Sequence, residues 1–269
     1  MSFFKNKVVA ITGGSEGIGK ALIEVLIPLG AKIATCARNY DKLYTLQLQY
    51  SNVMLHIMTC DVSNEQDCKR FIDSTIKTFG GIDILVNNAG INIRGFFMDT
   101  GIDTVRRIMD TNFYGAVYCT RFALPSILER KGSIVGISSI AGYRGLPGRS
   151  GYSASKFALQ GWMEALRTEL LNTGINIMWV APGYTGSNIR QMTPVNQPGT
   201  LQPTTQEDEE KMMPADECAR YIIHAIEKRK RNLVLTLNGK STVFVNKFFP
   251  AWADKLVHKF FIKDGNLIK

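Results

Sequence analysis

The sequence predicts an α/β protein in which one parallel sheet carries helices on both faces and is followed by a C-terminal helical extension. Short apolar runs alternate with stretches of helical periodicity along most of the chain. The apolar runs end in glycine, asparagine or aspartate, which is typical of buried strands that lead into turns. Strands separated by amphipathic helices imply βαβ units, and therefore parallel pairing.

Each expected element follows from its local pattern. The run KVVAITGG is apolar and ends in glycines, as a buried strand does, whereas KALIEVLIPLG has helical spacing and stops at Gly30. The same alternation predicts strands at 7–14, 31–38, 53–62, 82–90, 132–139 and 175–183, and helices at 20–30, 40–50, 65–80 and around Tyr152. No repeat or linker divides the chain, so we expect a single domain, 1–269, with its core at about 5–235.

Two segments depart from this alternation. Residues 185–214 are polar and rich in proline, threonine and glutamine, which is typical of a substrate loop or of a mobile connection. The tail at 248–269 places Trp252, Leu256 and Phe260 at helical spacing among basic residues. It therefore predicts a basic amphipathic helix.

Charge and cysteine content limit the functional classes. The net charge is +9, and the stretch from Glu227 onward holds ten Lys/Arg and three Asp/Glu. Such a tail is typical of contact with phospholipid, nucleic acid or an acidic substrate, and equally of a solvated helix face. No apolar stretch approaches the roughly 18 residues of a spanning helix, and the start lacks a signal-peptide pattern. Five scattered cysteines without a CxxC pair favour reduced thiols over disulfides or a metal site, so we expect a cytoplasmic protein.

A glycine-rich segment follows the first predicted strand and opens the first helix. In TGGSEGIGK, Gly13, Gly17 and Gly19 form GxxxGxG rather than the general GxGxxG dinucleotide pattern. Glycines let the backbone turn sharply and approach a pyrophosphate, and a helix N-terminus favours its negative charge. The segment therefore predicts a dinucleotide site, with an ordinary glycine-rich turn as the alternative.

The end of the second strand distinguishes the two nicotinamide dinucleotides. An acid there binds the 2′-hydroxyl of NAD, whereas an arginine accommodates the 2′-phosphate of NADP. This chain has Arg38 and no carboxylate before Asp41, which favours NADP(H) over NAD(H). Glu16 in the phosphate loop is a counterweight, because an acid there does not help a 2′-phosphate. Asp61, after the third strand, is placed to meet the adenine edge.

Tyr152 and Lys156 are about one helical turn apart in SGYSASKFALQ, so their side chains share a face. One interpretation is a surface pair with its amine in water. The other is a proton donor, because a fixed cation favours the phenolate form of a tyrosine whose ordinary pKa is near ~10.

Several motifs then occur together in a familiar order. They are TGGSEGIG, NNAG at 87–90, Asn112 in MDTNFYGAVY, GISSIAG at 136–142, YSASK at 152–156 and PG at 182–183. Over about residues 5–235 the chain resembles the short-chain dehydrogenases/reductases. Its tail resembles those of hydroxysteroid-dehydrogenase-like and ketosphinganine-reductase-like members, which handle lipids. The resemblance implies a Rossmann-like fold and an NAD(P)-dependent oxidoreductase.

The resemblance also implies roles for individual residues. The catalytic tetrad of the family matches Asn112, Ser139, Tyr152 and Lys156. Tyr152 would exchange a proton with the substrate oxygen, Ser139 would hydrogen-bond that oxygen, and Lys156 would bind the ribose. Asn112 would hold a water that links Lys156 to solvent. The spacing of the family motifs assigns the catalytic role to Ser139. Ser138 is therefore expected to have a structural role. The full expected cofactor set is Gly13, Ser15, Gly17, Ile18, Gly19, Arg38, Asp61, Val62, Asn88, Ala89, Gly90, Tyr152, Lys156, Pro182, Gly183 and Ser187.

We therefore expect an NADP(H)-dependent enzyme that interconverts a carbonyl group and a secondary alcohol on a small hydrophobic ketone or alcohol. The residues expected near the substrate are Asn92, Arg94, Phe96, Phe97, Ile140, Tyr143, Leu146, Tyr184, Ile189 and Met192. Alternatives are an NAD(H)-dependent dehydrogenase of a small polar substrate and a non-catalytic dinucleotide-binding regulator. The family also implies a homo-oligomer, a dimer or tetramer, and no nucleic-acid-binding motif is found. The tail either touches a membrane surface or covers the pocket, or it packs on its own subunit or a partner.

Overall fold

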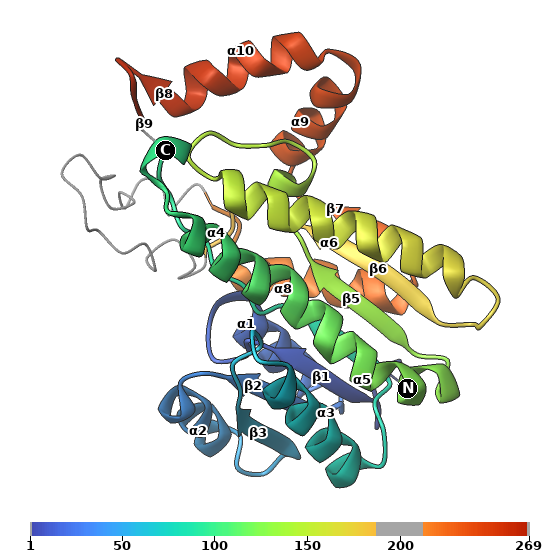
Figure 1. Cartoon of the computed structure of the whole chain (residues 1–269). Helices are drawn as coiled ribbons and strands as arrows, with labels where there is room; N and C mark the ends of the chain where they lie inside the picture. Colours follow the sequence, from blue (N-terminus) through green and yellow to red (C-terminus); the bar gives the residue numbers. More distant parts are fainter. Residues whose placement is uncertain (1, 187–211, 268–269) are drawn as a thin grey trace.

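A computed structural model describes residues 2–186 and 212–267 (Figure 1). Its centre is a seven-stranded sheet in the order β3-β2-β1-β4-β5-β6-β7, and every neighbouring pair is parallel. The strands are β1 (Val8–Thr12), β2 (Lys32–Ala37), β3 (Leu55–Thr59), β4 (Ile84–Asn87), β5 (Ser133–Ile137), β6 (Asn176–Ala181) and β7 (Asn232–Val234). The predicted doubly wound sheet is confirmed, because the strand order reverses between β1 and β4.

Helices cover both faces of the sheet. One face carries α1 (Gly17–Leu26), α2 (Tyr40–Gln49) and α8 (Ala215–Glu227), and the other carries α3 (Glu65–Phe79), α4 (Ile102–Met109), α5 (Gly115–Glu129) and α6 (Ser150–Glu169). Each face has its own buried apolar layer, so the inner strands β1, β2, β4, β5 and β6 are buried on both sides, while the edge strands β3 and β7 are partly exposed. This explains why the inner strands read as continuous apolar runs rather than as alternating patterns.

Local signals set the helix ends. The side chain of Asn39 accepts a hydrogen bond from the Lys42 backbone at 3.0 Å and so caps α2, and Asn64 caps α3 in the same way. Gly80 ends α3 with φ 78°, a left-handed conformation that favours glycine. These caps hold the loops at both ends of the strands in place.

The C-terminal extension begins earlier than expected. It consists of α9 (Leu237–Phe248), α10 (Pro250–Phe261) and a short hairpin of β8 (Ile262–Lys263) and β9 (Asn266–Leu267). Thr236 starts α9, because its side-chain oxygen accepts from the Gly239 backbone at 3.0 Å. Pro250 then begins a second helix, a position that suits a residue without an N–H. Figure 1 shows both helices at one end of the molecule, beyond the start of α6.

The extension is attached to the loop after β5. The Arg144 guanidinium donates to Asn246 at 3.0 Å and to Asp254 at 2.5 Å, and Asn246 donates to the Tyr143 carbonyl at 2.8 Å. Along α10, Ala253 and Phe261 are buried against the protein.

The predicted apolar stripe of the tail is only partly covered, and two of its members, Leu256 and Phe260, also line the cavity at the carboxyl ends of the strands. Trp252 is 55% exposed, and Leu256 and Phe260 are 44% exposed. No helix in the two described ranges is both long and apolar enough to cross a bilayer.

Candidate active site

A cavity of about 960 Å³ lies at the carboxyl ends of the strands. It runs from the loop after β1, past the ends of β2 to β6, to the inner side of α10. Its volume is near the upper end of the range for ligand sites in proteins. In open α/β sheets this edge is where ligands bind.

The glycines of the loop after β1 leave a cradle in this cavity. Gly13 has φ +71°, and a Cβ added to it would lie 2.9 Å from the Ala89 Cα. A Cβ on Gly19 would lie 2.2 Å from the Gly13 carbonyl oxygen. Glu16, the N-cap of α1, makes no side-chain capping hydrogen bond, so the first N–H groups of α1 remain available to a phosphate. The cradle and the uncapped helix fit a dinucleotide.

Hydrogen bonds from Asn88, directly after β4, hold the glycine loop after β1 in place. Its side-chain nitrogen donates to the Thr12 carbonyl at 2.9 Å and to the Gly13 carbonyl at 3.0 Å. The Thr12 hydroxyl in turn accepts from the backbone nitrogens of Asn88 and Ala89, each at 3.0 Å. Asn88 therefore fixes the shape of the loop, in addition to lining the cavity.

The end of β2 brings charged groups to the far end of the cavity. Arg38 and Lys42 both line it, and Arg38 is exposed. The Lys42 ammonium lies 2.9 Å from a Glu16 carboxylate oxygen. Asp61 lines the same end, with one carboxylate oxygen accepting from the backbone and hydroxyl of Ser63 at 3.0 and 2.8 Å.

Tyr152 and Lys156 lie together on α6 at the middle of the cavity. The Lys156 ammonium is 5.6 Å from the centroid of the Tyr152 ring and donates to the Ile137 carbonyl at 2.8 Å. Lys156 is only 3% exposed, and burial lowers its pKa to about 8. At neutral pH it is still mostly charged, so it places a positive charge beside the phenol.

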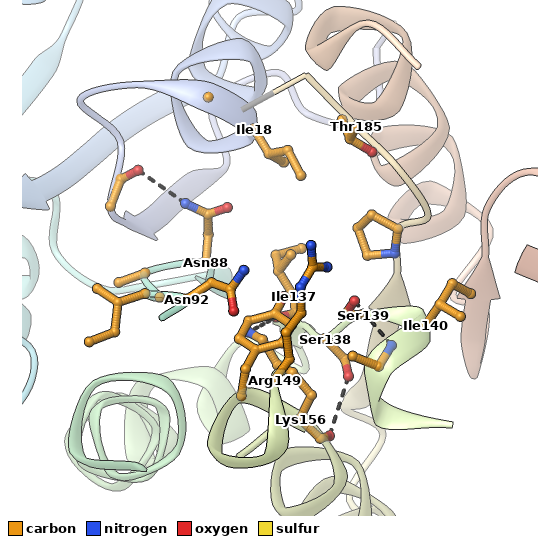
Figure 2. Close-up of a pocket in the computed structure, with 18 of the residues that line it drawn as sticks. Ile18, Asn88, Asn92, Ile137, Ser138, Ser139, Ile140, Arg149, Lys156 and Thr185 are labelled. Carbon is orange, nitrogen blue, oxygen red and sulfur yellow. Dashed lines mark hydrogen bonds between the residues drawn. The ribbon is translucent and has the colours of Figure 1, made fainter. Parts of the chain in front are cut away.

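The two serines after β5 have different surroundings. The Ser138 hydroxyl donates to the Lys156 carbonyl at 3.3 Å and accepts from the Gln160 amide at 2.8 Å, which ties β5 to α6. Within the described ranges, the Ser139 side-chain oxygen accepts a hydrogen bond only from the Ala141 backbone, at 3.2 Å. Its proton is therefore available to a ligand, and Figure 2 shows the residue facing the cavity.

Asn112 lies behind the cavity wall, in a π-helical turn, Asp110–Tyr114, that joins α4 to α5. Its side chain exchanges hydrogen bonds with the Ile91 backbone at 2.7 and 2.9 Å and donates to the Ser155 hydroxyl at 3.0 Å. A Cβ on Gly90 would lie 3.2 Å from Asn112 and 3.6 Å from the Lys156 nitrogen. Asn112 thus positions the strand end that faces Lys156.

The structure gathers most of the predicted cofactor and catalytic residues around one cavity. Those that line it are Gly13, Ser15, Gly17, Ile18, Arg38, Asp61, Val62, Asn88, Ala89, Gly90, Ser139, Tyr152, Lys156, Pro182 and Gly183. Gly19 and Asn112 support its walls from behind. Ser187 lies outside the described residues. The functional roles of all these residues stay predictions.

The predicted substrate residues divide into three groups: those that line the cavity, those that do not, and those outside the described residues. Asn92, Ile140, Leu146 and Tyr184 line the cavity, but Arg94 and Phe96 do not. Phe97 also lies outside the cavity, 63% exposed on a one-turn helix. Tyr143 does not line the cavity either: its hydroxyl accepts a hydrogen bond from the Trp179 ring nitrogen at 2.9 Å. Ile189 and Met192, like most of the predicted loop, lie outside the described residues.

Sequence reasoning missed several residues that line the cavity. Lys42, one turn beyond Arg38, and Arg149, three residues before Tyr152, could have been found from their spacing. The start of α9 and the inner side of α10 also line the cavity: Thr236, Asn238, Gly239, Ser241, Thr242, Leu256, Val257, Phe260 and Phe261. Leu256 and Phe260 belong to the apolar stripe that the sequence predicts, whereas no local signal marks the others, because the fold of the tail brings them there.

Comparison with known proteins gives consistent matches. The family model of short chain dehydrogenases matches residues 7–197. A rat protein, dehydrogenase/reductase SDR family member 7B, is 35% identical over 244 residues, which is 87% of this chain and 75% of its own.

Two solved structures share the fold. A short chain dehydrogenase/reductase from Burkholderia phymatum in complex with NAD has a TM-score of 0.83 at 24% identity, covering 94% of this chain and 96% of its own. An alcohol dehydrogenase from Thermococcus sibiricus complexed with 5-hydroxy-NADP has a TM-score of 0.74 at 24% identity, with 85% and 95% covered.

Proposed function

Because this chain belongs to the short-chain dehydrogenase/reductase family, we propose that it interconverts a carbonyl group and a secondary alcohol on an apolar substrate, using NADP(H). Membership of this family makes the protein an NAD(P)-dependent oxidoreductase. The NADP(H) preference, the apolar substrate and the proton donor are our proposal. The observation that carries it is the pairing of Tyr152 with buried Lys156 beside the same cavity that holds the glycine cradle.

The residues of the chain would handle the proton while the bound dinucleotide supplies or accepts the hydride. In reduction, the Tyr152 hydroxyl gives its proton to the carbonyl oxygen, and in oxidation it takes the proton back. The charge of Lys156, held by the Ile137 carbonyl, favours the phenolate that forms. Ser139 donates its free proton to the same substrate oxygen and stabilises the developing charge.

The adenosine end of the cavity supports NADP(H). Arg38 and Lys42 are the cations lining that end in the described part of the chain, and both suit a 2′-phosphate. Glu16 opposes this, because it pairs with Lys42 and lies near the same site. We assign NADP(H) because the two cations, Arg38 and Lys42, outnumber the one acid that opposes them, Glu16.

The inner wall of the substrate end supports an apolar substrate. Ile140, Leu146 and Tyr184 line it, together with Leu256, Val257, Phe260 and Phe261 from α10. The test is NADPH oxidation with a panel of ketones that runs from ketose sugars to steroid ketones and long-chain alkanones, with NADH in parallel. We expect the apolar ketones to react and NADPH to be preferred. Turnover of the sugars alone, or of no ketone at all, contradicts the proposal.

We also propose that the tail meets a membrane surface. The aromatic side chains on its outer side are 55 to 58% exposed: Phe244, Phe248, Phe249 and Trp252. Exposed lysines flank them: Lys240, Lys247, Lys255 and Lys259. An aromatic stripe with basic neighbours suits the headgroup region of an anionic bilayer.

Co-sedimentation with vesicles tests the membrane contact. We expect the protein to pellet with phosphatidylcholine vesicles that contain phosphatidylserine. The double variant Phe248→Ser/Trp252→Ser should lose this binding, whereas Tyr221→Ser, which removes an exposed aromatic ring from α8, should keep it. Equal pelleting of all three proteins contradicts a membrane role for the stripe.

Homo-oligomerisation is the last part of the proposal. Apolar side chains are exposed on α4, α6 and the π-turn between α4 and α5: Ile102, Tyr114 and Phe157. Exposed apolar groups on neighbouring helices are typical of an association surface. Light scattering during size-exclusion chromatography should give a dimer or tetramer, and Phe157→Lys should shift it towards the monomer.

A further inference from the structure

Arg149 stands immediately before α6, three residues ahead of Tyr152, and is only 8% exposed. It lines the cavity. Figure 2 shows its side chain rising into the middle of the cavity, between Asn92 on one side and Ser139 on the other. Arg149 therefore brings a permanent positive charge close to the proposed reaction centre.

This guanidinium has no polar partner among the described residues. Its Nε atom is buried without a hydrogen bond, and no carboxylate within those residues pairs with it. Its one ring contact is with Phe261, at 5.9 Å from the Arg149 Cζ to the ring centroid. Arg144, in the same loop, is instead bound to Asn246 and Asp254. A buried charge without a partner is costly, so the described residues lack the group with which Arg149 would pair.

No acidic side chain that lines the cavity within the described ranges can be that group. The acidic residues that line it in the described ranges are Glu16 and Asp61, which lie at the adenosine end beside Lys42 and Ser63. Asn92, 3% exposed, has a buried side-chain oxygen without a partner. An amide can turn either face to a ligand, so Asn92 can add a donor beside the guanidinium.

The surroundings of Arg149 define the rest of the ligand. Leu146 lines the cavity from the same loop, and Leu256, Val257 and Phe261 line it from α10. A Cβ on Gly148 would lie 2.4 Å from Leu267, so the tail closes directly over this loop. A charge that faces apolar walls suits an amphipathic molecule.

We propose that the substrate is an amphipathic oxyanion: a ketone or alcohol whose carboxylate or phosphate is bound by Arg149 while its apolar chain lies along α10. The assignment deepens the proposed function and rests on it, because it names the substrate class of the same site. It makes Arg149 a specificity residue, which selects anionic over neutral substrates.

The turnover test compares matched pairs of substrates. The 4-, 5- and 6-oxododecanoates and their methyl esters are reduced with NADPH, and kcat/KM is compared within each pair. We expect the acid to exceed its ester about tenfold or more at the best spacing, as a charge-assisted hydrogen bond does. The ratio should fall to about one in Arg149→Met and stay partly above one in Arg149→Lys. Arg220→Met, an exposed arginine on α8, should keep the wild-type ratio.

A ratio near one in the wild type, or an unchanged ratio in Arg149→Met, overturns the proposal. If Arg149→Met instead weakens NADPH binding tenfold, the charge serves the cofactor and the proposal is also wrong. Thermal unfolding of each variant shows whether it is folded. If Arg149→Met does not fold, the comparison between the wild type and Arg149→Lys still tests the proposal.

A binding experiment separates this inference from the proposed activity. Dodecanoate and dodecyl phosphate are titrated calorimetrically into the protein with saturating NADP⁺, with 1-dodecanol as the neutral control. We expect one or both anions to bind at least tenfold more tightly than the alcohol, and Arg149→Met to abolish the difference. Absence of NADPH oxidation by every ketone contradicts the reductase, whereas equal binding of anion and alcohol overturns the role of Arg149.

Discussion

The Lys156 ammonium lies 5.6 Å from the centre of the Tyr152 ring, while the carbonyl of Ile137 holds it at 2.8 Å from the neighbouring strand. The helix determines the spacing of the two side chains, and β5 determines the direction in which the lysine points. The phenol therefore has a positive charge beside it before any ligand binds.

Replacing Tyr152 by phenylalanine should remove turnover but not cofactor binding. The ring and its packing remain, whereas the proton donor is lost, so we expect kcat to fall by about 10³-fold or more. The Kd for NADPH, measured by fluorescence titration, should change less than about threefold. Tyr221→Phe is the matched control on α8. Retention of a tenth of the activity would exclude Tyr152 as the donor.

The pH dependence of kcat/KM should reflect Lys156. Burial lowers its pKa to about 8, so the charge beside Tyr152 is lost as the pH rises through about 8. We expect kcat/KM to decline above that pH. An activity that stays level up to pH ~10 would contradict the role of the ammonium.

The same pKa predicts a change in stability. Between about pH 8 and the ordinary value of 10.5, the unfolded state binds a proton that the folded state does not, so stability rises with pH. The penalty for burying the charged lysine is fully present below about pH 8 and amounts to about 3 kcal/mol. Lys156→Met should remove this rise in the free energy of unfolding. Denaturant titrations of both proteins across that range measure the difference.

Cofactor preference should depend on the charges after β2. Arg38→Asp removes a cation and adds an acid that suits a ribose hydroxyl, so the KM ratio of NADPH to NADH should rise at least about tenfold. Unchanged ratios would refute the assignment.

Glu16 should act in the opposite direction. It lies 2.9 Å from Lys42, so Glu16→Gln frees that ammonium for a 2′-phosphate and removes a negative charge. We expect a few-fold lower Kd for NADPH and little change for NADH. Higher salt should reduce the gain, because exposed charges are screened. A weaker affinity for NADPH in this variant would show that Glu16 helps the cofactor.

The glycine cradle should tolerate no side chain. A methyl group at Gly19 would lie 2.2 Å from the Gly13 carbonyl and 2.6 Å from the Asn88 amide, so the loop must open. We expect Gly19→Ala to weaken NADPH binding more than about tenfold. Gly161→Ala is the matched control, because nothing lies within 4 Å of that position on α6, where alanine favours the helix by about 1 kcal/mol. Equal affinities for the two variants would contradict the cradle.

The parallel sheet, the phosphate loop and the shared helix face of Tyr152 and Lys156 could all be predicted from local sequence patterns. Each depends on local signals: apolar runs with turn residues, glycines before a helix, and a spacing of one helical turn. The spacing of the family motifs also singled out Ser139, and the hydrogen bonds of Ser138 to α6 agree with a structural role for the other serine.

The construction of the substrate end depends on contacts between distant parts of the chain, which local patterns do not report. The tail was expected to be one amphipathic helix, but it forms two, α9 and α10. Leu256 and Phe260 of the expected stripe line the cavity, Trp252 is exposed, and Phe261 is buried beside Arg149. The contacts that place it there join Arg144 to Asp254, which is 110 residues away in the sequence. Periodicity reports which residues share a helix face, but not which face another part of the chain will cover. For that reason the phosphate loop could be predicted from the sequence, whereas the burial of Arg149 without a polar partner among the described residues could not.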